Sequence, residues 1–335
     1  MKLMLRPGKP GDAKACGQIC FNAFTTISRQ HGFPPDVPSV EMATGFLTML
    51  LSRPNIYSIV AEADGKVVGS NFLWEGDTIA GIGPITIDPD NQNSGVGRGL
   101  MENVLARAAE RKFVGVRLVQ AAFHNRSLSL YTKLGFEVRE PLACIQGTPL
   151  KKSFAGFPIR PATESDLEAC RQLCQRIHGH DRKNELSGAI QQKTATLVER
   201  NGRITGYATG IGFFNHAVAE SNDDLKALIG AAAEFGGPGF LLPSRNSEVF
   251  RWCLSEGLRV TQPLTLMSSG LYNEPRGAFL PSILFSSVCE PPVRSMFGCH
   301  CGSRRFRYQS WPGKHSATAT HSRRFLCRRR AFSIT

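Results

Sequence analysis

The sequence lacks several patterns that would assign its 335 residues to a familiar class. It has no apolar run of membrane-spanning length and no visible signal peptide, so we expect neither membrane insertion nor secretion. It has no Gly-x-Ser-x-Gly string, which argues against an acyl-enzyme serine. It also has no Gly-Lys-Ser/Thr nucleotide loop.

Acidic residues are scarce, and their distribution along the chain is uneven. There are 27 Asp and Glu against 40 Lys and Arg, a formal net charge of +13. Residues 286–335 carry 10 of the basic residues and Glu290 as their one acid, so +9 of the charge belongs to this tail. The tail shows no apolar periodicity, and we expect it to be disordered or translated out of frame. As an alternative, its basic strings bind nucleic acid or an anionic membrane. We expect no nucleic-acid or membrane binding by the body.

The cysteine pattern favours buried thiols over a metal site or disulfides. Cys16/Cys20 and Cys170/Cys174 are four residues apart on amphipathic stretches, with no histidine or second pair nearby. This spacing predicts core positions on helices. The Cys/His strings of the tail lack the two-residue spacing of zinc knuckles. We therefore expect no metal, and reduced thiols indicate the cytoplasm.

One glycine-rich segment carries the strongest chemical signal. An apolar run at 82–87 leads into it, and an amphipathic stretch at 100–109 follows; the segment reads Gln92-Asn93-Ser94-Gly95-Val96-Gly97-Arg98-Gly99. A strand that turns through glycines into a helix N-terminus presents unpaired N–H groups and partial positive charge to an anion. The segment is not a dinucleotide fingerprint, because the apolar stretch at 114–123 ends in His124-Asn125 with no acid. It therefore predicts a phosphate cradle of another kind.

A second informative block, residues 125–138, follows the glycine-rich segment. Asn125 is predicted to cap a short helix at 127–134, which Gly135 ends before a strand begins at Phe136. Together, Gln-x-x-Gly-x-Gly and Asn…Tyr…Leu-Gly-Phe resemble motifs A and B of the GNAT acetyltransferases. The resemblance covers residues 55–140.

The resemblance implies a cofactor, a reaction and a set of site residues. Acetyl-CoA would enter where the fourth and fifth strands splay apart, and the acetyl group would pass directly to a primary amine of a small molecule or peptide. Tyr131 would protonate the departing thiolate, since a phenol stays protonated at neutral pH. The implied cofactor contacts are Ile85, Thr86, Ile87, Gln92, Asn93, Ser94, Gly95, Val96, Gly97, Arg98, Asn125 and Tyr131. Asn125 acting only as a cap, and Tyr131 only as core, remain alternatives.

An internal repeat predicts a second unit. Arg6-Pro7…Asp12…Cys16…Cys20 recurs at a constant offset as Arg160-Pro161…Asp166…Cys170…Cys174. The copy has no glycine-rich cradle, carries Asp223 and Asp224 instead, and has Trp252 where the first unit has Tyr131. We expect a mixed α/β fold with largely antiparallel sheets: an acetyltransferase unit at 1–150, a degenerate unit at 158–285 and the tail at 286–335. A groove between the units would take the acceptor, and the loop at 31–36 is a candidate wall for it.

The general base is the missing element of the pattern. Glu75, Asp77 and His124 are weak candidates, each more simply read as a loop charge or a satisfied histidine. An alternative function follows: a GNAT-like fold that senses acyl-CoA without turnover. The sequence does not define the oligomeric state.

Overall fold

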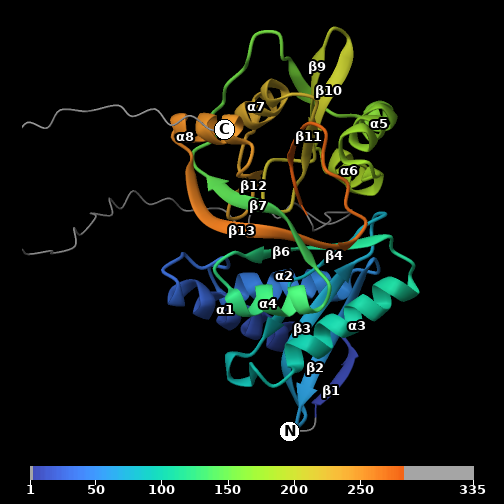
Figure 1. The fold of residues 1–335 in the computed structure, drawn as a ribbon, viewed down its shortest axis with the longest axis vertical. Helices are drawn as coiled ribbons and strands as arrows, with labels where there is room; N and C mark the ends of the chain where they lie inside the picture. The colour runs from blue at the N-terminus through green and yellow to red at the C-terminus, as the bar shows by residue number, and fades with distance from the viewer. Residues whose placement is uncertain (1–2, 283–335) are drawn as a thin grey trace, which may run out of the picture. The chain divides into compact units, whose positions relative to one another are not determined.

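The computed structural model describes residues 3–282, shown as the coloured ribbon in Figure 1. Residues 283–335 lie outside the described part, so the predictions for the tail are not addressed by it. Within residues 3–282, no helix combines the length and apolarity that crossing a membrane requires.

The first half of the chain contains both helices and strands, among them the helices that follow the two motifs. Its elements are β1 (Leu3–Pro7), α1 (Ala13–Gln30), α2 (Val40–Ser52), β2 (Ile56–Ala63), β3 (Lys66–Trp74), β4 (Ala80–Ile82), β5 (Thr86–Ile87), α3 (Val96–Glu110), β6 (Gly115–Ala121), α4 (Asn125–Lys133) and β7 (Glu137–Gln146). Short 3-10 turns precede α1 and α3, at Pro10–Asp12 and Pro89–Asn91.

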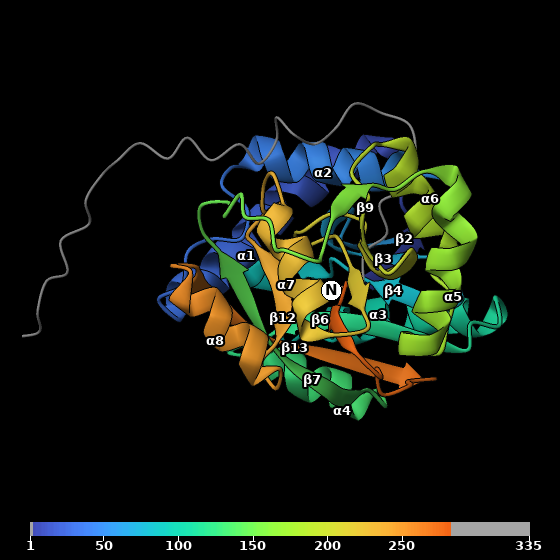
Figure 2. The same cartoon turned by 90° about the horizontal axis from the view of Figure 1, so that it is seen from above.

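The second half repeats this order. Its elements are β8 (Ile159–Pro161), α5 (Leu167–His178), α6 (Lys183–Gln191), β9 (Thr196–Arg200), β10 (Arg203–Ala208), β11 (Ala217–Ala219), α7 (Asn222–Ala231), β12 (Phe240–Pro243), α8 (Ser247–Ser255), β13 (Arg259–Gly270) and β14 (Ala278–Leu280). A 3-10 turn at Glu164–Asp166 precedes α5. Helices α5 and α6 pack together, and α5 contacts β10 and β11 (Figure 2).

The described strands form two sheets. One has nine strands in the order β1-β2-β3-β4-β6-β13-β7-β12, with β5 paired to β3, and the other has the order β14-β11-β10-β9-β8. All the strand pairings are antiparallel except β4 with β6. The predicted mixed α/β class with largely antiparallel sheets is confirmed.

The strand pairing does not give each half of the chain a sheet of its own. Strand β13, from the second half, lies between β6 and β7 of the first half, and β7 pairs in turn with β12 (Figure 1). All the described residues belong to one compact unit. Sequence periodicity could not indicate this exchange, because alternation fixes which face of a strand is buried but not which neighbour it pairs with.

The internal repeat of the sequence corresponds to a set of ion pairs that occurs once in each half. Arg6 donates two 2.8 Å hydrogen bonds to Asp12 and two, of 2.8 and 2.6 Å, to Glu62. Arg160 donates two 2.7 Å hydrogen bonds to Asp166 and two, of 3.1 and 2.7 Å, to Glu199. In each half, one guanidinium therefore joins the first strand to the turn before the first helix and to the second strand.

The predicted core positions are buried. Helix α3 buries Leu100, Met101, Val104 and Ala108 against the sheet, with Leu105 partly buried. The two cysteine pairs are free thiols in the cores beneath α1 and α5. One face of the first-half sheet is thus covered by α3 and α4, and the opposite face packs against α1 and α2.

Candidate functional site

The glycine-rich segment forms a tight loop between β5 and α3. The Asp88 carboxylate accepts a 3.1 Å hydrogen bond from the Asp90 amide, and the Ser94 hydroxyl donates to the Asn91 carbonyl at 2.5 Å. Gly95 then takes a left-handed conformation with φ of 87°, which costs a glycine little because it has no Cβ. This turn leads the chain directly into α3 at Val96.

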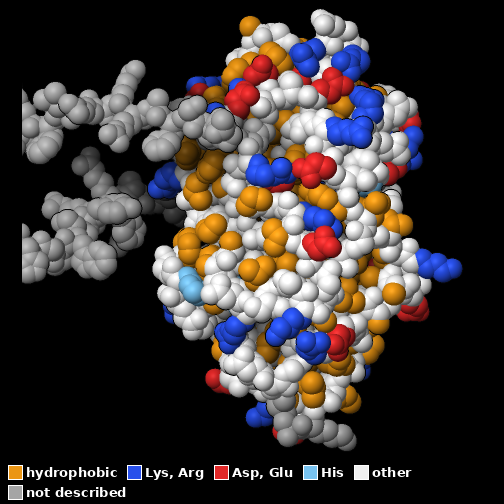
Figure 3. Space-filling model, in the orientation of Figure 1, with side chains coloured by type: hydrophobic (Ala, Val, Ile, Leu, Met, Phe, Trp, Pro, Cys, Tyr) orange, Lys and Arg blue, Asp and Glu red, His pale blue; other side chains and the backbone are white. Residues whose placement is uncertain are grey.

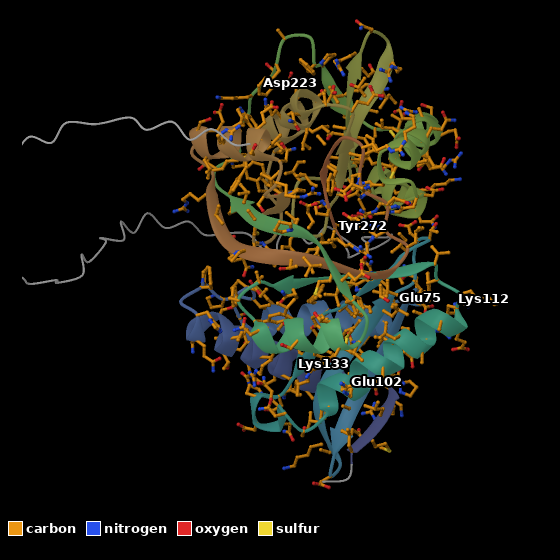
Figure 4. All side chains as sticks on the ribbon, in the orientation of Figure 1. Glu75, Glu102, Lys112, Lys133, Asp223 and Tyr272 are labelled. Atoms are coloured by element: carbon orange, nitrogen blue, oxygen red, sulfur yellow. The ribbon has the colours of Figure 1, made fainter. Side chains whose placement is uncertain are left out.

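The first turn of α3 leaves its amides available. Within residues 3–282, no backbone acceptor pairs with the N–H groups of Val96, Gly97 or Arg98, and the first bond that closes the helix runs from Gly99 N to Gly95 O at 3.0 Å. The Arg98 side chain is half exposed and makes a weak surface pair with Glu102, labelled in Figure 4. The loop therefore combines free amides, the positive helix end and a movable guanidinium, which together suit a phosphate.

Gly97 joins the loop to the second motif. A Cβ placed there would lie 3.3 Å from Ile87 Cδ1 and 3.6 Å from Leu130 Cδ2. Strand β5, α3 and α4 thus meet at this glycine. The two motifs, separated in the sequence, are therefore brought together at Gly97.

The strands beside this loop part from one another. The parallel pairing of β4 and β6 covers the pairs Ala80–Val116 and Gly81–Arg117, and β5 pairs with β3 alone in the described chain. The backbone of residues 85–87 therefore has an edge toward β6 that no described strand occupies. A free strand edge is the feature that pairs with an extended amide-bearing chain.

Helix α4 differs in one detail from the sequence prediction. The cap is His124, whose Nδ1 accepts a 3.1 Å hydrogen bond from the Ser127 amide, and Asn125 is the first helical residue and is exposed. The prediction that Asn125 caps the helix was wrong, because a ring nitrogen one residue earlier performs that task. Gly135 ends the helix in a left-handed conformation, as predicted.

Tyr131 lies in the core between α4 and the sheet. Its side chain is buried near Phe136, with ring centroids 6.1 Å apart. Burial alone raises the pKa of the phenol well above its usual range, so it stays protonated at neutral pH.

A polar atom at the end of β6 lacks a protein partner. Gln120 is buried, its Oε1 accepts a 3.1 Å hydrogen bond from the Ser127 hydroxyl, and its Nε2 has no acceptor among residues 3–282. Buried amide groups are normally satisfied. An unpaired donor on β6, beside the splayed strands, would suit a carbonyl of a pantetheine chain.

The three base candidates from the sequence are held by other interactions. Glu75 pairs with Arg107 at 2.7 Å and Arg111 at 3.7 Å. The lone pair of His124 Nδ1 is already engaged, because it accepts a hydrogen bond from the Ser127 amide. Burial also lowers the pKa of His124. Burial and the nearby Glu185 raise the pKa of Asp77 to about 7. Asp77 accepts a 3.3 Å hydrogen bond from the Asn184 amide and lines a cavity between the two halves of the chain.

Sequence reasoning missed Asp36 as a titratable site residue. It lies in the loop between α1 and α2, and its Oδ1 accepts a 2.7 Å hydrogen bond from Gln262 of β13. Phe33 of the same loop stacks on Phe123, with centroids 4.3 Å apart, directly before the α4 cap. Burial raises the pKa of Asp36. No local pattern distinguishes this aspartate, because its partner is in the other half of the chain.

A cavity does lie between the halves, as expected, but it is small. Its volume is about 30 Å³, and Trp74, Asp77, Arg117, Arg182 and Glu185 contribute to its walls. That volume suits water-sized particles and not an acceptor substrate.

In the second half, the start of α7 is surrounded by carboxylate and hydroxyl side chains. At the start of α7, the Ser221 hydroxyl accepts from the Asp224 amide, and the fully buried Asp224 carboxylate binds Arg200 at 2.9 Å and Thr205 at 2.6 Å. The exposed Asp223 precedes it in the same turn (Figure 4). Two carboxylates thus lie in the first turn of α7, whereas the first turn of α3 has glycines and no acidic residue.

Comparison with known proteins agrees with this geometry. The family model for the acetyltransferase (GNAT) domain matches residues 54–138. A mycothiol acetyltransferase of Tsukamurella paurometabola is 34% identical over 82 residues, which are 24% of this chain and 28% of that relative. The match therefore spans less than a third of the relative.

Two solved structures share the fold over most of the chain. One, named as an acetyltransferase of Pyrococcus horikoshii, has a TM-score of 0.62 at 16% identity and covers 86% of this chain and 94% of its own. The other, a tandem GNAT protein from the clavulanic acid biosynthesis pathway, has a TM-score of 0.50 at 13% identity, with coverage of 80% and 98%. The chain therefore carries a GNAT acetyltransferase domain at residues 54–138, as the two motifs indicated.

Proposed function

We propose that the protein is an N-acetyltransferase that moves an acetyl group from acetyl-CoA directly to a primary amine. The observation that carries the proposal is the junction at Gly97, where free helix amides, a free strand edge and the Tyr131 helix meet. When bound, acetyl-CoA would supply the acetyl group as a reactive thioester.

The proposed binding residues form two groups, one for the pantetheine part of the cofactor and one for its pyrophosphate. The backbone of Ile85, Thr86 and Ile87 would bond the pantetheine amides along the free edge of β5. The loop Gln92–Arg98 would hold the pyrophosphate through its amides and the Arg98 guanidinium. Exposed Asn125 and buried Tyr131 would lie toward the thioester end.

The chain's own residues would manage the two protons of the reaction. Tyr131 keeps its proton at neutral pH and would donate it from Oη to the leaving sulfur. The incoming amine must lose a proton, and we propose the Asp36 carboxylate as its acceptor, held in place by Gln262. The raised pKa of Asp36 suits a base that works near neutral pH.

We further propose that residues 1–150 are the catalytic unit and that residues 158–285 shape the acceptor site without binding a second acetyl-CoA. The Asp224 carboxylate and its partners at the start of α7 support this assignment of roles to the two halves. The acceptor would be an amine of a small molecule or peptide. On the face shown in Figure 3, Lys and Arg side chains are interspersed with Asp and Glu, which supports an acceptor other than a nucleic acid. We propose the cytoplasm as the location, because the six described cysteines are free thiols.

The test is calorimetric titration of the full chain with acetyl-CoA and with CoA, followed by a screen of amines for thiol release. One-to-one binding with turnover would support the proposal. Binding without turnover over a broad amine set would favour an acyl-CoA sensor. Two sites would contradict the division of roles, and no binding by a folded sample would reject the cofactor site.

A further inference from the structure

Arg117 is a buried cation that forms no ion pair within residues 3–282. It lies on β6, is 8% exposed, and its Nε has no hydrogen-bond acceptor among these residues. Within the described residues, its guanidinium joins none of the ion pairs and lies over the Tyr272 ring, 5.4 Å from the centroid. A guanidinium keeps its charge in proteins, and a buried charge needs compensation.

Two more polar atoms near Arg117 are unsatisfied. His178 Nε2 on α5 and the Tyr272 hydroxyl after β13 are both buried without a hydrogen-bond partner in the described part of the chain. Figure 4 labels Tyr272, which comes from the second half of the chain. Both residues line, with Arg117 and Arg182, a cavity of about 10 Å³. That is room for one particle of about the size of water.

The walls of this cavity carry positive charge and no carboxylate. The remaining lining residues are apolar or neutral. Glu185 lies nearby but is engaged by Arg182 at 2.5 Å and by His216 at 2.8 Å. Arg139, on the Tyr272 ring at 5.1 Å, is paired with Glu137 at 2.7 Å. Arg117, which also lines the larger cavity that holds Asp77 and Glu185, is therefore the one arginine of this group that forms no ion pair within residues 3–282.

We propose that this cavity binds a monatomic anion, with chloride as the physiological occupant, held by Arg117 Nε, the Tyr272 hydroxyl and His178 Nε2. A water molecule would satisfy these three atoms but would bring no negative charge to a cavity lined by two arginines and no carboxylate. The ion would join β6 of the first half to α5 and residue 272 of the second, and so lock the two halves together.

Thermal unfolding of the full chain tests this site. The melting temperature is measured in sodium chloride and in sodium gluconate at equal ionic strength. We expect it to rise with the logarithm of chloride concentration and not with gluconate, because an ion that binds only the folded state stabilises it by mass action. Arg117→Gln should abolish the chloride dependence. If that variant does not fold, Tyr272→Phe, which keeps the charge and removes one donor, should raise the half-saturating chloride concentration several-fold.

Crystals soaked in sodium bromide locate the ion. The expected result is an anomalous difference peak within hydrogen-bond distance of Arg117 Nε and His178 Nε2. Equal melting temperatures in chloride and gluconate, or a bromide soak with no peak at this position, would overturn the proposal in favour of a buried water.

Discussion

Gln262 Nε2 donates a 2.7 Å hydrogen bond to Asp36 Oδ1 across 226 residues of sequence. The bond exists because β13 of the second half is inserted between two strands of the first. A carboxylate from the loop between α1 and α2 is thereby tied to β13, and Phe33 of the same loop stacks on Phe123, the residue before the α4 cap. This arrangement gives the proposed base its position.

We predict that Asp36→Asn lowers kcat about 100-fold with little change in affinity for CoA, since one positioned proton acceptor contributes on that scale. The wild-type rate should rise with pH through an apparent pKa above the ordinary carboxyl range. An exposed aspartate, changed as Asp90→Asn, serves as the control. A pH–rate profile that is unchanged in Asp36→Asn would contradict the assignment.

The same variant has a stability signature. Because the pKa of Asp36 is raised in the folded state, folding binds protons between the ordinary carboxyl pKa and the raised one. The free energy of unfolding therefore falls as pH rises through that window. Asp36→Asn should remove this loss and be at least as stable as wild type at pH 7, as urea denaturation would measure.

We predict that Gly97→Glu abolishes CoA binding. The new side chain would press on Ile87 and Leu130, and its charge would enter a loop suited to phosphates. Ala106→Glu adds the same group to an exposed position of the same helix and should bind CoA normally. Near-normal affinity of Gly97→Glu in calorimetry would remove the cradle from the site.

We predict that Tyr131→Phe lowers kcat about 100-fold while the Kd for CoA stays within a factor of two or three. The matched control is Tyr57→Phe, whose hydroxyl donates a 2.9 Å hydrogen bond to Asn103. That variant should lose about 1 kcal/mol of stability and keep its rate. If the two variants turn over alike, Tyr131 is a core residue and not the proton donor.

We predict that Asp224→Ala costs about 3 kcal/mol of unfolding free energy, because it leaves Arg200 and Thr205 without their buried carboxylate. Asp223→Ala, one residue away and exposed, should change stability by less than about 0.5 kcal/mol. Urea denaturation measures both. Equal effects would show that the α7 network is not a structural substitute for a phosphate site.

The sequence by itself determined the features whose causes are local. The glycine at position 95, the helix after it and the glycine that ends α4 follow from turn chemistry and periodicity. The repeat from Arg6 to Cys20 and from Arg160 to Cys174 was visible because the two halves use the same contacts. The fold class and the GNAT resemblance at 55–140 both rested on such local signals.

Only the tertiary structure decided what depends on contacts between distant residues. The insertion of β13, the pairing of Asp36 with Gln262 and the isolation of Arg117 required both halves to be folded together. The capping of α4 by His124 instead of Asn125 was decided by which side chain could reach the Ser127 amide. Periodicity fixes the buried face of a segment, but the neighbour that completes a sheet or a charge pair is selected by the whole chain.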